Sequence, residues 1–208
     1  MRISSALRAC ALPSAISLLC GLVLGIVPPL LAGDGGPVRQ AAHIALSGGW
    51  PWAALAFFVG TAQRTRIQSA ALAALSLCTA VTAYYATKAT HDIRGSNLGD
   101  PAARLVSEPF DWGALAFWGI CACLLGSLLG WAGNLARERG MWGLLSRLLI
   151  PAISLVETTA RLRVEAPSGP PIMAMTWGLT RGLAVAAATG LIAHAVIGRL
   201  RTRRPAES

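Results

Sequence analysis

The sequence predicts an all-α membrane protein, a single bundle of six transmembrane helices with both termini in the cytoplasm. Composition is the first observation behind this prediction: the chain is 54% hydrophobic and only 13% charged, whereas soluble domains carry about 25% charged residues. The second is a series of apolar runs long enough to cross a bilayer, which takes about 20 residues. The third is that Lys and Arg are concentrated in alternate links between these runs.

The apolar runs are separated by polar or Gly/Pro-rich segments, and we expect them to form one transmembrane domain over residues 1–208. A basic cytoplasmic tail, 199–208, follows the last run. The predicted spans cover about 12–32, 44–62, 69–89, 112–136, 141–163 and 176–198.

The distribution of basic residues sets the predicted orientation in a bacterial inner (plasma) membrane, where positive charge favours the cytoplasmic side. The outer side holds seven of the nine acids. It also holds seven of the 18 basic residues, namely Arg39, Lys88, Arg94, Arg104, Arg161, Arg163 and Arg181. The inner side holds the other eleven, namely Arg2, Arg8, Arg64, Arg66, Arg137, Arg139, Arg147, Arg199, Arg201, Arg203 and Arg204.

The first two spans each leave an alternative open. Arg2 and Arg8 precede the first apolar run as they would in a signal peptide, but the run is long and "PLLAG" has Leu where a small residue is wanted. In the second, "LSGGWPW" predicts a short external helix over 38–47, a break, and a span from Trp50. The alternative is a discontinuous helix whose N-terminus binds an anion or another ligand, as in transporters.

The fifth span carries a polar stripe. At 100° per residue, one arc of about 120° holds Arg147, Pro151, Ser154, Glu157, Thr158, Arg161 and Glu165. An amphipathic helix lying on the membrane is the competing interpretation. It would leave the Arg-rich tail outside, so we expect a spanning helix with its polar face toward the bundle.

A charge within a span generally pairs, because an unpaired one costs about 2.5–3.5 kcal/mol. Glu157 lies about 24 Å up its helix from the cytoplasmic end, at 1.5 Å per residue, and Arg181 on the sixth span lies about 25 Å up. Tyr84 and Tyr85 on the third span lie at about 23 Å. We therefore predict a Glu157–Arg181 pair and a candidate ligand-binding site of Glu157, Arg181, Arg161, Tyr84 and Tyr85.

Small residues at four-residue intervals predict close helix contacts in three spans. The first span has Gly21-x-x-x-Gly25, and the fourth has a ridge that includes Gly126 and Gly130. The sixth should pack tightly through Gly178, Gly182, Ala186, Gly190 and His194. We interpret His194 as a structural residue, because no second cluster of metal ligands accompanies it.

The motifs of common enzymes are absent, including GxSxG, HExxH, Walker A and GxGxxG. We therefore expect no enzyme, no catalytic residue, no cofactor and no metal, and the scattered Arg residues do not indicate nucleic-acid binding. His91, Asp92, Asp100, Glu108 and Asp111 could bind a cation, but a solvated loop of mixed charge is the favoured interpretation.

The segments "FFVGTAQRTRIQSAALAALSLCTAVTAYY" and "LIPAISLVET" resemble an uncharacterised, actinobacterial-type family of small six-span membrane proteins. Six spans with cytoplasmic termini are also loosely similar to substrate-binding components of energy-coupling transporters, a likeness of architecture only. The first hypothesis is a binding or transport subunit with a polar site in the outer half and ATPase or membrane partners. The alternative is a structural or regulatory protein in which Glu157–Arg181 pairing only specifies packing.

Overall fold

The computed structural model describes residues 2–33, 35–96 and 110–202, and the described chain is helical, with no strand. The helices are α1 (Arg2–Leu31), α2 (Pro37–Leu46), α3 (Gly49–Ala62), α4 (Arg66–Ser96), α5 (Trp112–Leu135), α6 (Met141–Val164) and α7 (Pro171–Thr202). The predicted all-α class is therefore confirmed. The cation-binding alternative for the 90–111 loop rests mainly on side chains outside the described residues.

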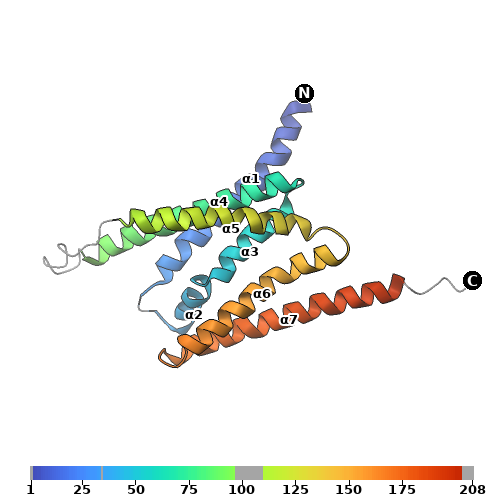
Figure 1. The fold of residues 1–208 in the computed structure, drawn as a ribbon. Helices are drawn as coiled ribbons and strands as arrows, with labels where there is room; N and C mark the ends of the chain where they lie inside the picture. Colours follow the sequence, from blue (N-terminus) through green and yellow to red (C-terminus); the bar gives the residue numbers. More distant parts are fainter. Residues whose placement is uncertain (1, 34, 97–109, 203–208) are drawn as a thin grey trace, which may run out of the picture.

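Five described helices are long and apolar enough to cross a membrane, and the bent pair α2–α3 makes a sixth candidate if it counts as one span. The helix ends agree with the predicted spans to within a few residues, except that α1, α4 and α7 are longer. The α3–α4 and α5–α6 links lie at one end of the molecule (Figure 1). The cytoplasmic placement of that end remains a prediction.

The second predicted span is broken, as the "SGGWP" sequence indicated. Helices α2 and α3 meet at a bend of 60° around Ser47 and Gly48. Because α3 has only 14 residues, it is about 21 Å long at 1.5 Å per residue. This is shorter than the roughly 30 Å of a hydrocarbon core, so in a membrane the break would lie below the surface.

Helices α1, α3, α4 and α5 pack closely through small residues. A side chain added at Gly21 or Gly25 of α1 would overlap the α4 backbone, and one at Gly60 of α3 would overlap the α5 backbone at Gly130. The core around these contacts contains Ala56, Val59, Leu72, Ala73, Leu77, Val81 and Ala122. The predicted ridges of the first and fourth spans therefore act as packing surfaces, as small-residue ridges do where two helices approach closely.

Helices α6 and α7 form a separate hairpin beside this bundle (Figure 1), and α6 contacts mainly α3 while α7 contacts α2. The buried face of α6 includes Ser154 and Thr158 from the predicted polar stripe, whereas Arg147 is exposed. The prediction of tight packing along the α7 ridge is wrong. Added side chains at Gly178, Gly182 and Gly190 would meet nothing within 4 Å, because this ridge faces away from α6 and α2.

Candidate binding site at the broken helix

The N-terminus of α3 needs hydrogen-bond acceptors that its own sequence does not supply. The first N–H groups of any helix have no partner within the helix. Here the N-cap residue is Gly48, which has no side chain to accept them. Pro51 in the first turn has no N–H, so Gly49 and Trp50 carry the backbone donors that need an acceptor. Below a membrane surface, such donors require a partner within the protein.

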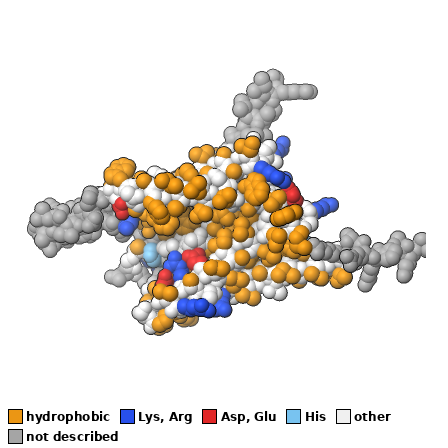
Figure 2. Space-filling model, viewed as in Figure 1, with side chains coloured by type: hydrophobic (Ala, Val, Ile, Leu, Met, Phe, Trp, Pro, Cys, Tyr) orange, Lys and Arg blue, Asp and Glu red, His pale blue; other side chains and the backbone are white. Residues whose placement is uncertain are grey.

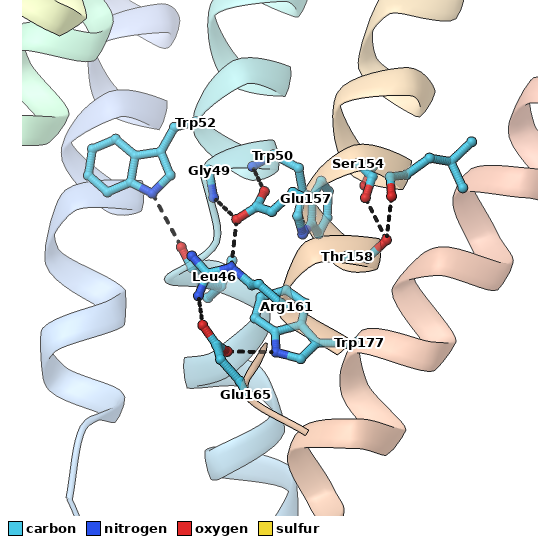
Figure 3. Close-up of polar contacts among 11 residues, drawn as sticks. Leu46, Gly49, Trp50, Trp52, Ser154, Glu157, Thr158, Arg161, Glu165 and Trp177 are labelled. Carbon is cyan, nitrogen blue, oxygen red and sulfur yellow. Dashed lines mark hydrogen bonds and ion pairs between the residues drawn. The ribbon is translucent and has the colours of Figure 1, made fainter. Parts of the chain in front are cut away.

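Glu157 of α6 supplies both acceptors (Figure 3). Its Oε1 accepts a hydrogen bond from the Gly49 N–H at 2.7 Å, and its Oε2 accepts one from the Trp50 N–H at 2.8 Å. The carboxylate thus binds the helix terminus with both oxygens. The positive end of the α3 dipole also favours a negative charge at this position.

Arg161 continues the network one helical turn along α6. Its Nε donates to Glu157 Oε1 at 3.0 Å, and its Nη1 donates to Glu165 Oε1 at 2.7 Å. The three residues follow i, i+4 spacing, which places them on one helix face. The Glu157 side chain is 17% exposed and Arg161 is 33% exposed, so this charged group is half-buried rather than a solvated surface pair.

Glu157, Arg161 and Glu165 form a charged cluster. Trp177 of α7 packs against it and is only 1% exposed. The Arg161 guanidinium lies 4.9 Å from the centre of the Trp177 ring. The indole Nε1 of Trp177 donates a hydrogen bond to Glu165 Oε2 at 3.3 Å. The face of an aromatic ring attracts a cation at this separation. Trp177 therefore joins α7 to the same charged group that holds α3.

Space is limited where the chain breaks. A Cβ added at Gly48 would lie 3.2 Å from Glu157 Oε1 and 3.2 Å from atoms of Trp50 and Trp177. Glycine thus permits the carboxylate and the two rings to approach the break. The indole N–H of Trp50 is buried without a hydrogen-bond partner among the described residues, which leaves a donor unused on a residue that already binds the carboxylate.

The predicted Glu157–Arg181 pair is wrong. The ion-pair partner of Glu157 is Arg161, whereas the Arg181 side chain is exposed on α7. Equal height on two antiparallel helices does not fix the rotation of either helix, and the face of α7 that meets α6 carries Trp177. Arg181 is therefore outside the cluster.

Tyr84 and Tyr85 belong to an aromatic group on the opposite side of the break. The Tyr84 ring packs edge-on against Trp52 at 6.0 Å and against Tyr85 at 5.5 Å. The indole N–H of Trp52 donates to the carbonyl oxygen of Leu46, the last residue of α2, at 3.3 Å. The tyrosines thus support the bend from α4, and their ring contacts are with aromatic side chains rather than with Glu157.

The sequence contained signals for the residues that our prediction missed. "SGGWP" combines a helix break, two adjacent N–H donors and a proline, which together predict a helix terminus in need of an anion. Glu157 on the fifth predicted span was the carboxylate available as its partner. Figure 2 shows this side of the molecule, where acidic and basic side chains gather beside a recess in an otherwise mostly hydrophobic face.

The chemistry of the cluster is that of carboxylate recognition. Two backbone N–H groups and a guanidinium converge on one carboxylate, a donor set suited to an anion. No group of three or more His, Cys, Asp or Glu side chains capable of holding a metal occurs among the described residues.

Comparison with known proteins places the chain in a family. The sequence model of a family of unknown function, DUF6518, matches residues 4–207. The chain belongs to this family. No curated protein and no solved structure matches it.

Proposed function

We propose that this protein is a transport-related subunit of the bacterial plasma membrane that binds a small carboxylate at the N-terminus of α3. The observation that carries the proposal is the bidentate contact of Glu157 with Gly49 and Trp50 at the break of a span. Broken spans whose helix N-termini face anionic groups are typical of secondary transporters. Glu157 would then occupy the site in the absence of ligand.

Binding would require the ligand carboxylate to take the place of the Glu157 carboxylate at the two N–H groups. Arg161 contacts both Glu157 and Glu165, so it could retain a displaced Glu157 without leaving either acid unpaired. The unpartnered indole N–H of Trp50 offers a further donor to a ligand larger than formate or acetate. The proposal includes no enzymatic activity, and movement of the ligand would depend on a partner such as a cytoplasmic ATPase.

A second candidate function is structural. The Glu157 carboxylate already accepts hydrogen bonds from Gly49, Trp50 and Arg161, and this observation favours a permanent joint between α3 and the α6–α7 hairpin. In that case no exogenous anion would enter, and the family would act through its fold or its protein partners.

Chemical rescue tests the proposed carboxylate site. Glu157→Ala removes the bound carboxylate and leaves two N–H groups and Arg161 without it, so we expect a loss of about 2–4 kcal/mol in stability. Formate or acetate, compared with chloride at equal ionic strength, should raise the melting temperature of this variant in detergent. Glu138→Ala removes a more exposed carboxylate paired with Arg66 and should show no rescue.

The wild-type protein then separates the two functions. Stabilisation of wild type by one member of a panel of carboxylate metabolites supports the binding function. Rescue of Glu157→Ala without any effect of the panel on wild type supports the structural one. Absence of rescue excludes the proposed site, and affinity purification from native membranes tests for an ATPase partner.

A further inference from the structure

A second polar region lies at the opposite end of the α6–α7 hairpin, where α5 joins α6 (Figure 1). An open cleft of about 470 Å³ lies here between the start of α6 and the end of α7. Its lining contains no acid and consists of Arg139, Gly140, Leu144, Arg147, Leu191, His194, Ala195 and Gly198.

The basic groups of the cleft come from three parts of the chain. Arg139 lies in the α5–α6 link, Arg147 on α6 and His194 on α7. The link also contains Glu138, but its carboxylate pairs with Arg66 of α4 at 2.5 Å and does not line the cleft. The cleft therefore retains the positive charge of its two arginines.

Arg147 is held so that part of its guanidinium remains available. Its Nε donates to the carbonyl oxygen of Ala136, the C-cap of α5, at 2.8 Å. This contact draws the side chain from α6 back toward the α5–α6 link, as expected of an arginine that reaches for a membrane surface. The two terminal nitrogens of a guanidinium so fixed can still donate to an anion.

The start of α6 adds to the positive potential. Gly140, which lines the cleft, is its N-cap and provides no side-chain acceptor. The positive end of the α6 dipole thus lies at the same place as Arg139 and Arg147.

The level of the cleft in a membrane is marked by aromatic residues. Trp131 near the end of α5 and Trp142 at the start of α6 are both exposed, and tryptophan is enriched where a bilayer meets water. Arg139 lies in the link at this level, and the apolar side chains of Leu144 and Leu191 also line the cleft. Basic groups beside apolar walls match a phospholipid, which carries a phosphate next to its acyl chains.

We propose that this cleft binds an anionic phospholipid, with the phosphate held by Arg139, Arg147 and His194 and an acyl chain along Leu144 and Leu191. A basic site between spans on the predicted cytoplasmic side fits the negative lipids of that leaflet. This inference is independent of the proposed function, because its residues are at the other end of α6 from Glu157.

The test uses the purified full-length protein and measures melting temperature and lipid retention by native mass spectrometry. Phosphatidylglycerol should stabilise the protein and remain bound, whereas phosphatidylcholine at the same concentration should not. Arg139→Gln and Arg147→Gln should each weaken phosphatidylglycerol binding about fivefold, and the double variant about thirtyfold. Arg163→Gln removes an equal charge from the other end of α6 and should leave binding unchanged.

Three outcomes would overturn the proposal. These are equal binding of both lipids, unchanged binding in the double variant, and an equal stabilising effect of inorganic phosphate alone, which would indicate a soluble phosphate ligand. Arg147→Gln also removes the contact with Ala136 and could impair folding. Arg139→Gln provides the decisive variant in that event, since Arg139 lies in the link between α5 and α6 and outside both helices.

Discussion

The two halves of this molecule are held together by different means. In α1, α3, α4 and α5, glycines bring backbones into direct contact, and 44% of the α4 span is buried. In the α6–α7 hairpin, a Cβ added at Gly178, Gly182 or Gly190 of α7 would meet nothing within 4 Å, and 6% of the α7 span is buried. Glu157 and its partners join the hairpin to the bundle near the end where α6 connects to α7.

This contrast shows that a small-residue ridge does not determine its own use. Gly126 and Gly130 on α5 and Gly178 and Gly182 on α7 have the same spacing, yet only the first pair meets another backbone. Helix association in a membrane depends on shape and polar contacts, because apolar side chains gain little by leaving lipid. For α6 and α7, polar contacts replace close packing with the bundle.

The largest expected effect comes from filling a contact in the packed bundle. A side chain at Gly130 would overlap the Ser69 carbonyl and lie 2.5 Å from the Ala73 Cβ, so Gly130→Leu forces α4 and α5 apart. We expect a loss of about 3 kcal/mol or more, at the upper end of overpacking effects. Unfolding in mixed micelles, followed by tryptophan fluorescence, measures it.

Gly190→Leu is the matched control, since nothing lies within 4 Å of an added Cβ. We expect a change within about 0.5 kcal/mol, as for an exposed substitution. A large loss at Gly190 would contradict the comparison, because it would mean that the α7 ridge packs against another surface.

Most of the fold was predictable because the spans are long and apolar and are separated by polar links. The break at Ser47–Gly48 was also visible, since glycine and proline coincide there. The contacts of α7 were not, because helical periodicity gives the residues of a ridge but not the neighbour that the ridge faces.

The next effect distinguishes Arg161, the observed partner of Glu157, from Arg181, the predicted one. Arg161→Gln leaves Glu157 and Glu165 without the cation between them and removes the contact with Trp177. We expect a loss of about 1–3 kcal/mol, the cost of removing hydrogen bonds to charged groups. Hydrogen exchange should increase at Gly49 and Trp50, while the exchange of α4 and α5 should not change.

Arg181→Gln is the matched control for Arg161→Gln, because it also removes one positive charge from a span. Arg181 is exposed and outside the cluster, so its loss should leave stability unchanged or raise it, since a lone charge in a span is costly. An equal loss in both variants would show that Arg181 has an unidentified partner and would weaken the distinction between the two regions.

Less of the candidate site was predictable than of the fold. Glu157 and Arg161 were recognised as part of a polar stripe within a span, but the partner chosen for Glu157 was Arg181 rather than Arg161 at i, i+4 spacing. The α3 terminus was considered as an anion site only in the alternative of a discontinuous helix, and its two backbone donors were not connected with Glu157, because N–H groups do not appear in a search for charged side chains. Trp177 was not among the predicted site residues, because its burial against Arg161 depends on the rotation of α7.

The smallest effect concerns the joint between α7 and the cluster. Trp177→Phe keeps an aromatic face for Arg161 but removes the 3.3 Å hydrogen bond to Glu165 and weakens the cation–π contact. We expect a loss of about 0.5–1 kcal/mol, with α7 exchanging faster than α4. Trp112→Phe, at an exposed tryptophan of α5, is the control and should have no effect. If Trp177→Phe instead destabilised α4 and α5 as much as α7, the hairpin and the bundle would unfold as one unit, and the two regions would differ in packing but not in stability.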